Sequence, residues 1–413
     1  MTRYQKIVIG VSLLIALGIR IQVALHDNTS TLRGDATSYD EIAMNLVQGK
    51  GYRYAGGELT ASRLPLYPLF LAAIYRVAGH NYQAARMVQA VLSTLTVLLI
   101  ALWAHTLFGG LSACLAALIA SVYPAFYAYY FSSTELITET LYVFLLTAAL
   151  YTFSVYWTRP SWSWAVISGL FWGLTSLTRP SSLPFLFLLP FISILLRYPL
   201  RQMLRYCGMV WFMVGLVMAP WMIRNYLVFR HLVPVSTGVG VNLYSAFHPE
   251  NRDGFGLDVF YKFYMPEEER LSSLGVPEAE RANYFFRKGL GFIRAYPGHA
   301  FRLFVRRIFL YMDPRTTLYR GGKRQIVTWG YLFVLTGTVA AFFLSLRHKK
   351  YRREILSLCL IFGYFVLFYG SMGGSERYRF PTEPILILLA SFTLSFLPLF
   401  PRQNSKAGVE SIA

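Results

Sequence analysis

Hydrophobic residues are gathered along this chain into long runs, and the polar residues lie mainly in the segments between them. A bilayer core takes about 20 apolar residues in one helix, and several runs approach or reach that length. The pattern therefore predicts an all-α integral membrane protein with about ten spanning helices, within a range of 9 to 12. The expected ranges are 7–25, 87–108, 111–130, 138–157, 163–178, 183–196, 206–223, 327–346, 355–371 and 384–400.

Two apolar segments are open to another interpretation. Residues 64–78 are apolar but include two prolines and Arg76, which favours a membrane-surface or partly inserted segment. The first run, 7–25, is also compatible with a cleaved signal peptide. Because Arg20 interrupts it and no small-residue cleavage site follows, the sequence favours an uncleaved first helix.

A short amphipathic helix is predicted between the first two spans. Ser38 and Glu41 are spaced as a capping box, with Ser38 at the N-cap, and Gly49 is a suitable stop. One apolar face is made by Tyr39, Ile42, Ala43 and Leu46, at helical spacing. We expect this helix to lie on the outer membrane surface.

Composition excludes several classes of protein. The 413 residues include 39 Lys plus Arg against 20 Asp plus Glu, for a net charge of +19. Yet 55% are hydrophobic and only 14% charged, where soluble domains carry roughly 25% charged residues. A soluble enzyme, a disordered chain and a disulfide scaffold are therefore excluded. The three cysteines all lie in apolar stretches, which is typical of packing residues.

The placement of the positive charges predicts the orientation, because short cytoplasmic loops are rich in Lys and Arg. With both termini cytoplasmic, the cytoplasmic ends carry Arg3, Lys6, Arg159, Arg197, Arg201, Arg205, Arg347, Lys349, Lys350, Arg352, Arg353, Arg402 and Lys406. Segments 26–86 and 224–326 then face outward. We expect three units: 1–223 with the first outer loop, the outer loop 224–326, and 327–413. Nucleic-acid binding is disfavoured, because the basic residues are split between two membrane sides.

Acidic residues near the outer boundary are the first candidates for chemistry. Asp35 precedes the predicted surface helix beside Arg33, where the helix dipole favours an ionised carboxylate that can accept a proton from a hydroxyl. Capping of that helix is the simpler role. Glu135 and Glu139 are four residues apart, hence on one face if that turn is helical. The side chain of each glutamate either has a functional role or extends to the membrane interface. For Glu139, which lies deeper in the predicted span, a functional role is favoured.

Several landmarks occur in an order that resembles the GT-C glycosyltransferases. The nearest branch contains the protein O-mannosyltransferases and the lipid A aminoarabinose transferase. The landmarks are Gly34-Asp35 with Tyr39, Ala43, Leu46 and the turn 49–52; the segment 63–69 that begins with Arg63; Arg86; Thr138-Glu139; the segment 173–180 with Arg179-Pro180; and the segment 377–381 with Arg377-Tyr378-Arg379. One departure is Leu64, which stands where the family has a proline.

The resemblance implies a GT-C-like bundle that moves a sugar, hexose or pentose, from a polyprenyl-phosphate donor at the outer face of the inner membrane. The acceptor is a glycolipid, a glycan or a protein, and the reaction is a single inverting displacement. Asp35 aligns with the catalytic aspartate and Glu139 with an acidic position of the second outer loop. The expected substrate-binding residues are Arg63, Arg86, Arg179, Arg377, Tyr378 and Arg379. Arginine suits a phosphate because its planar fork pairs with two oxygens, although pairing with lipid head groups is the alternative.

No cofactor is assigned. Some relatives bind a divalent metal through acidic and histidine residues of the outer loops, so such a metal is left open. No matching pair is evident in this chain, and Glu58 and His248, as isolated residues, support no assignment.

The second outer loop is strongly basic. Between Arg281 and Arg324 the chain has eleven Lys or Arg and one acid, Asp313. Within 300–311, Arg302 and Arg306 share one face, while Phe301, Phe304 and Ile308 form an apolar side. We expect an interfacial helix that holds an anionic acceptor or lies on anionic lipid.

The alternative class is a multi-pass lipid or glycan transporter or flippase without catalysis. Such a protein favours charged residues near the bilayer midplane and an internal repeat, and the sequence shows neither. An outer-face glycan polymerase or ligase shares the basic loops, but it does not call for the Gly-Asp pair ahead of a surface helix.

Overall fold

The computed structural model describes residues 1–26, 32–55, 57–127, 135–315, 322–347, 349–373 and 376–397. In these residues nearly all regular structure is helical, and the extended pairing is a single bridge between Arg53 and Leu59. The all-α prediction is confirmed. The C-terminal tail with Arg402 and Lys406, which the sequence predicts to be cytoplasmic, lies outside the described residues.

The α-helices and short 3-10 or π turns (η) follow one another along the chain. They are α1 (Arg3–His26), α2 (Asp35–Val47), α3 (Leu66–Ala78), α4 (Tyr82–Phe108), α5 (Gly110–Val122), η1 (Pro124–Phe126), α6 (Glu139–Thr158), α7 (Trp162–Ser176), α8 (Ser182–Phe185), α9 (Leu189–Leu195), α10 (Leu200–Phe229), α11 (Gly238–Phe247), α12 (Leu257–Val259), η2 (Phe260–Tyr264), α13 (Met265–Ser273), α14 (Glu278–Ala295), α15 (Pro297–Met312), α16 (Gly322–Arg347), η3 (Lys349–Tyr351), α17 (Arg352–Met372), α18 (Glu376–Arg379), η4 (Phe380–Thr382) and α19 (Glu383–Ser395).

Six helical segments within the described residues are long and apolar enough to cross a bilayer. They are α1, α4, α6, α10, Arg324–Arg347 of α16, and Lys349–Met372, which includes α17. The segments Leu66–Ala78, Gly110–Val122 and Ser182–Leu195 are apolar but shorter. In the last of these, α8 and α9 replace the continuous span expected at 183–196; α9 has a proline in its first turn, which cannot donate a backbone hydrogen bond. The count of about ten spans stays a prediction.

Small residues let the long helices approach one another. A Cβ atom on Gly169 or Gly173 of α7 would collide with Met213 or Val217 of α10, and one on Gly337 of α16 with Ala390 of α19. Such glycine contacts are a usual device in membrane helices, where van der Waals packing replaces the hydrophobic effect as the source of association.

The helix α2 begins earlier than the sequence predicts. Its N-cap is Gly34, with φ of 58°, and Asp35 is its first residue. Glycine adopts positive φ without the steric cost of a side chain, so the chain enters the helix before Ser38. The predicted capping box at Ser38 is therefore wrong. The apolar face of α2 packs on α3, with Tyr39 against Tyr67 at 5.0 Å between ring centroids.

A buried carboxylate fastens α2 to its neighbours. Asp40 accepts hydrogen bonds from the hydroxyl of Tyr75 in α3 at 2.8 Å and from Tyr82 in α4 at 3.1 Å, and its Oδ1 lies 2.8 Å from Nε2 of His80. Three partners on one side chain hold α2 in a fixed position against α3 and α4.

The helices α11 to α15 form a group that we call the second outer unit, because the sequence predicts that it faces outward, and this group is bonded to the first predicted outer loop. Glu278 accepts hydrogen bonds from the backbone N–H of Ala61 at 3.0 Å and from Thr237 Oγ1 at 2.5 Å. Arg224, near the end of α10, donates to the carbonyl oxygens of Thr60 and Tyr52 at 2.7 and 3.2 Å. The two loops that the sequence places apart are therefore joined.

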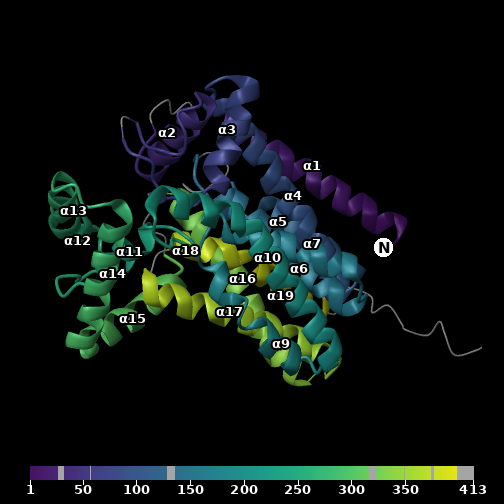
Figure 1. Cartoon of the computed structure of the whole chain (residues 1–413). Helices are drawn as coiled ribbons and strands as arrows, with labels where there is room; N and C mark the ends of the chain where they lie inside the picture. The colour runs from purple at the N-terminus through teal and green to yellow at the C-terminus, as the bar shows by residue number, and fades with distance from the viewer. Residues whose placement is uncertain are drawn as a thin grey trace, which may run out of the picture.

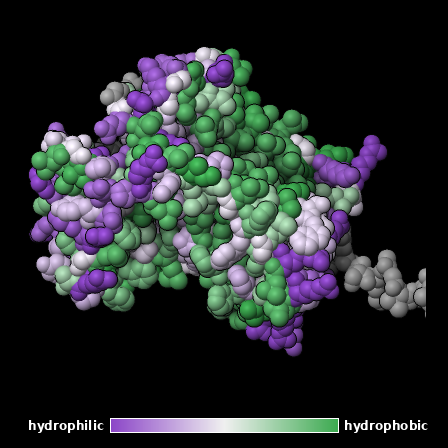
Figure 2. Space-filling model, in the orientation of Figure 1, coloured by the Kyte–Doolittle hydropathy of each residue, from purple (hydrophilic) through white to green (hydrophobic). Residues whose placement is uncertain are grey.

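The molecule has two polar ends and an apolar middle. The N-terminus lies at one end, while α2 and the helices α11 to α15 lie at the other (Figure 1). Figure 2 shows hydrophilic residues at both ends and a broad hydrophobic belt between them. This arrangement agrees with a membrane protein. Which end faces outward stays a prediction.

Candidate functional site

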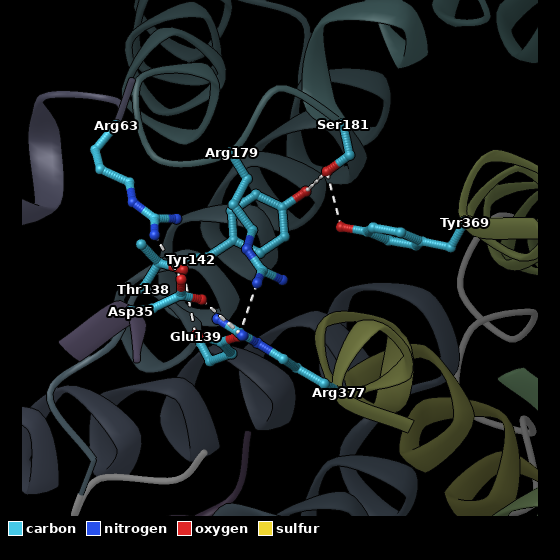
Figure 3. Close-up of polar contacts among 9 residues, drawn as sticks. All are labelled: Asp35, Arg63, Thr138, Glu139, Tyr142, Arg179, Ser181, Tyr369 and Arg377. Atoms are coloured by element: carbon cyan, nitrogen blue, oxygen red, sulfur yellow. Dashed lines mark hydrogen bonds and ion pairs between the residues drawn. The ribbon is translucent and has the colours of Figure 1, made fainter. Parts of the chain in front are cut away.

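Five charged side chains meet at the end of the bundle that carries α2. They come from five separate segments: Asp35 begins α2, Arg63 precedes α3, Glu139 begins α6, Arg179 lies between α7 and α8, and Arg377 belongs to α18 (Figure 3). We call these five residues the charged network. All five were candidates from the sequence, and the fold brings them together.

Asp35 is held between two arginines. Arg63 Nη2 lies 2.6 Å from its Oδ1, and Arg377 Nη1 lies 2.8 Å from its Oδ2. Burial alone would raise the pKa of Asp35, but the guanidinium groups of Arg63 and Arg377 outweigh it and hold that pKa well below the usual range. The carboxylate is therefore ionised at physiological pH. While both arginines remain in place, it is also a weak base.

Glu139 is fully buried and joins two of the arginines. Its Oε1 accepts from Arg179 Nη2 at 2.7 Å and from Arg377 Nε, and Thr138 Oγ1 donates to its Oε2 at 3.2 Å. As the first residue of α6, it lies where the helix dipole favours a negative charge. Extension of Glu139 to the interface is thus excluded.

Glu135 does not share a helical face with Glu139. The helix α6 begins only at Glu139, and residues 135–138 are not helical, so the four-residue spacing does not place the two side chains on one helical face. The prediction of an acidic pair on one helix was wrong. The backbone carbonyl of Glu135 accepts a hydrogen bond from Gln89 Nε2 at 2.9 Å.

Arg179 has an unused donor inside the network. Its guanidinium carbon lies 5.5 Å from the ring centroid of Tyr142 and 5.7 Å from that of Tyr378. Its side chain is only 10% exposed, and its Nη1 has no hydrogen-bond partner among the described residues. A buried donor without an acceptor is costly. This nitrogen is therefore suited to an oxygen of a bound anion.

A cluster of hydroxyl groups lies beside Arg179, and the sequence did not indicate it. Ser181 Oγ lies 2.8 Å from the hydroxyl of Tyr142 and 3.0 Å from that of Tyr369 (Figure 3). Tyr369 stacks on Tyr378 with 4.8 Å between ring centroids. Ser181 follows Arg179-Pro180 directly, and Tyr142 follows Glu139 by less than one turn. This proximity to the motifs was the available signal.

Arg379 belongs to a different environment. It is fully buried, and its Nε lies 3.2 Å from Glu383 Oε1. Its Nη1 donates to the carbonyl of Asp313 at 2.7 Å, and its guanidinium lies 3.4 Å from the ring centroid of Tyr331. These contacts fasten α18 to α16 and α19. Through these contacts Arg379 anchors the helix that presents Arg377, and its predicted contact with substrate stays a prediction.

Arg86 is also a candidate that the sequence singled out. It is buried in α4, where 4% of its surface is exposed. It acts electrostatically on Tyr75 and Tyr82, two of the residues that bind Asp40. The structure therefore places it close to the anchor of α2.

The described residues do not offer a metal site. No group of three or more His, Cys, Asp or Glu side chains lies close enough within them to hold an ion. The two carboxylates of the network are already paired with arginines. Glu58 is exposed, and His248 is packed against Phe263 and Phe292 in the second outer unit.

Comparison with known proteins identifies related sequence and fold. Residues 62–223 match the family model described as dolichyl-phosphate-mannose-protein mannosyltransferase. That range includes Arg63, Arg86, Glu139 and Arg179. No curated protein sequence matches the chain.

Solved structures resemble the chain over almost its whole length. Archaeal oligosaccharyltransferase AglB from Archaeoglobus fulgidus, in complex with an inhibitory peptide and a dolichol-phosphate, matches with a TM-score of 0.62 and 13% identity, over 95% of this chain and 50% of that one. The apo form of the Archaeoglobus fulgidus oligosaccharyltransferase matches with a TM-score of 0.60 and 15% identity, over 96% and 50%. ArnT from Cupriavidus metallidurans bound to undecaprenyl phosphate matches with a TM-score of 0.45 and 14% identity, over 95% and 78%.

The chain spans about half the length of the oligosaccharyltransferase that it matches. It has the GT-C fold, and the resemblance that the sequence landmarks indicate is confirmed.

Proposed function

We propose that this protein is a membrane glycosyltransferase that moves a sugar from a polyprenyl-phosphate donor to a glycolipid, glycan or protein acceptor. The charged network is the observation that carries the proposal, because it combines a possible base with arginines suited to a phosphate. The family-model match and the fold support it. The similar oligosaccharyltransferase was solved with a dolichol-phosphate, a lipid of the proposed donor class.

The charge of the network suits a donor with a single phosphate. Arg63, Arg179 and Arg377 carry three positive charges and Asp35 and Glu139 two negative ones, which leaves a net charge of +1. A sugar joined to a polyprenyl phosphate is a phosphodiester with one negative charge, so binding neutralises the site. A diphosphate donor would leave excess negative charge in a buried site, which is unfavourable without a cation.

In the proposed reaction, Asp35 is the base. The acceptor hydroxyl attacks the anomeric carbon on the face opposite the phosphate, the bond from that carbon to the phosphate oxygen breaks, and the hydroxyl proton moves to Asp35. The polyprenyl phosphate leaves with one additional negative charge, which the arginines stabilise. A single displacement of this kind inverts the anomeric configuration.

Binding of the donor also changes Asp35. When Arg63 and Arg377 turn toward the phosphate, the positive charges that lower the pKa of Asp35 are shared with another anion. That pKa then rises toward its ordinary value, and the carboxylate becomes a stronger base. Glu139 contributes without touching the substrate, because its carboxylate forms ion pairs with both Arg179 and Arg377 and so holds them near each other.

The network lies at the end of the bundle opposite the N-terminus (Figure 1). If the basic loops set the orientation as the positive-inside rule predicts, both termini are cytoplasmic and the network faces outward in the inner membrane. A polyprenyl donor would then reach the site from the outer leaflet.

The test separates sugar transfer from lipid movement. Purified full-length protein in lipid vesicles is incubated with polyprenyl-phosphate sugars, and the release of free polyprenyl phosphate is measured by mass spectrometry. A glycosyltransferase releases it in the presence of acceptor lipids, glycans and proteins extracted from a deletion strain. A transporter or flippase moves the intact donor across the vesicle and releases none. Absence of cleavage with every donor, when acceptor is present, contradicts the proposal.

A further inference from the structure

One buried arginine outside the charged network has no paired carboxylate among the described residues. Arg307 lies in α15 with none of its surface exposed. Its Nε donates to the carbonyl of Gly254 at 2.9 Å, and its Nη2 donates to the carbonyl of Ala246. These two bonds use one edge of the planar guanidinium, whereas its Nη1 has no partner among the described residues. No carboxylate in the described part of the chain forms an ion pair with it.

Another buried arginine shows that burial alone does not leave a guanidinium nitrogen unused. Arg20, equally buried in α1, donates through all three of its nitrogens: to Ser93 Oγ at 2.8 Å, to the carbonyls of Ala16 and Ser121 at 3.0 and 3.1 Å, and to that of Ala120 at 3.2 Å. A cation that only joins helices can thus be fully satisfied by carbonyls. Arg307 keeps one nitrogen unused, which costs free energy unless a ligand supplies an acceptor.

The surroundings of Arg307 are short of negative charge. Burial lowers the pKa of Arg307 to about 10, so it remains charged at neutral pH. The two titratable groups that act on it are Asp253 and Tyr378. Arg302 and Arg306 of the same helix are exposed and would draw an anion toward this region. Next to Ala246, the buried hydroxyl of Ser245 likewise has no partner among the described residues.

Arg307 is also close to the charged network. Tyr378, which acts on Arg307, is the same side chain that lies 5.7 Å from the guanidinium of Arg179. The helix α15 contacts α18, which carries Arg377. A molecule that reaches Arg307 would therefore lie beside the proposed donor site, on the side of the second outer unit.

We propose that Arg307 binds an anionic group, a phosphate or a carboxylate, on the acceptor. The proposal rests on the proposed function, because it assigns an acidic acceptor to the same site. The oxygens of the anion would take the unused Nη1 and the second hydrogen of Nη2, while the carbonyls of Gly254 and Ala246 keep the guanidinium in place. The reacting hydroxyl of the acceptor would then be directed toward Asp35.

A single turn covers Arg307. A Cβ atom on Gly254 would lie 3.6 Å from Arg307 and 3.3 Å from Leu310, so this residue sits directly on α15. The side chain of Asn251 binds the N–H of Gly254 at 2.9 Å, and that of Asp253 binds the N–H groups of Phe255 and Gly256 at 2.9 and 3.0 Å. The turn is also bonded to its neighbours, because the Asn251 amide donates to the carbonyls of Ser245 and Ala246 in α11, and Arg307 donates to Gly254. The hydrogen exchange of the turn therefore reports on binding at Arg307.

The test uses inorganic phosphate as the probe and the full chain in phosphatidylcholine nanodiscs. Hydrogen exchange in residues 251–256 is followed as phosphate is added, for the wild type and for Arg307→Gln. We expect phosphate to slow this exchange in the wild type and to act roughly tenfold more weakly in the variant, the scale of one lost charged hydrogen bond. Arg302→Gln, on the exposed face of the same helix, is the matched control and keeps the full response.

Two further variants test whether the result depends on misfolding or on the charged network. Arg307→Lys keeps the charge but lacks the planar fork that directs separate nitrogens to the two carbonyls and to the anion, so it also weakens the response. Arg377→Gln removes an arginine of the network and should keep the response of the turn. An unchanged response in both Arg307 variants, or no response in the wild type, overturns the proposal.

The lipid composition of the nanodisc distinguishes a lipid headgroup from an acceptor outside the bilayer as the source of the anion. If phosphatidylglycerol in the nanodisc protects residues 251–256 without added phosphate, and Arg307→Gln abolishes this protection, the group is a lipid headgroup. If only dissolved phosphate protects them, it belongs to an acceptor outside the bilayer. Donor cleavage is assayed separately: cleavage without a phosphate response disproves only the role of Arg307, and a response without cleavage disproves only the proposed function.

Discussion

Arg377 Nη1 lies 2.8 Å from Asp35 Oδ2, although 342 residues separate them in the chain. The same guanidinium donates through Nε to Glu139, so one side chain bridges both acids of the charged network. The closest ion pairs of Asp35 are thus made by the groups that we expect to bind the donor phosphate. We therefore expect the pKa of Asp35 to depend on whether donor is bound.

The first prediction concerns Asp35 as the base. Asp35→Asn should lower sugar transfer by about 10²- to 10⁴-fold, the range for loss of a general base, because the amide cannot accept the hydroxyl proton. Transfer is measured by release of polyprenyl phosphate, with the amount of protein in the membrane determined in parallel. Glu41→Gln is the matched control: it lies on the same helix, and among the described residues its side chain accepts a long hydrogen bond of 3.4 Å from Ala55 N. Transfer at the wild-type rate in Asp35→Asn would exclude this role.

The second prediction concerns the shape of Arg377. In Arg377→Lys the charge remains, but a single ammonium lacks the planar fork that reaches Asp35 and Glu139 at once. We expect a higher KM for the donor, and a loss of stability because Glu139 is fully buried. Thermal unfolding and donor titrations measure the two effects. Arg76→Lys, at an exposed position of α3, should change neither. A Lys variant with normal KM would show that the bridge is dispensable.

Much of the fold follows from the sequence, because long apolar runs and basic loops depend on local composition. The runs at 7–25, 87–108 and 138–157 correspond closely to α1, α4 and α6. The start of α2 could not be predicted from the Ser38 spacing, because a positive φ at Gly34 decides it. The spacing of Glu135 and Glu139 was misleading for a related reason, since residues 135–138 are not helical.

The members of the charged network could be named from the sequence, but their pairing could not. Five segments contribute one residue each, and only the packing of α2, α6 and α18 brings them within hydrogen-bond distance. Arg377 and Arg379 differ most in this respect. They are two residues apart and look equivalent in the sequence, yet one faces Asp35 and the other Glu383. The short helix α18 turns their side chains in different directions.

The third prediction concerns Arg379 as a positioning residue. Arg379→Lys should lose the contacts with Glu383 and the ring of Tyr331, so that α18 no longer holds Arg377 in place. We expect the KM for the donor to rise, as in Arg377→Lys, with a loss of stability. The double variant Arg377→Lys/Arg379→Lys should have little further effect on KM, because both changes act on the same contact. Effects that add fully would mean that Arg379 meets the substrate itself.

The last prediction is a pH dependence that separates the free enzyme from its donor complex. Because the pKa of Asp35 is lowered in the folded protein, its ion pairs stabilise the fold at every pH above the unfolded value of about 3.9, and this stability is lost as the pH falls through the folded pKa. The difference in stability between wild type and Asp35→Asn should then be constant from about pH 5 to pH 8. Glu267, with a pKa lowered to about 2 by hydrogen bonds from Arg270 and Tyr284, is common to both proteins and cancels.

Activity should show the complementary effect. The pH profile of kcat/KM reports the free enzyme, and that of kcat reports the enzyme with donor bound. If phosphate draws Arg63 and Arg377 away, the pKa of Asp35 rises in the complex, so the acid limb of kcat should lie at higher pH than that of kcat/KM. Both profiles are measured with one donor and acceptor over the range in which the protein stays folded. Coincident acid limbs would show that donor binding leaves this pKa unchanged, which contradicts the expected withdrawal of the arginines from Asp35.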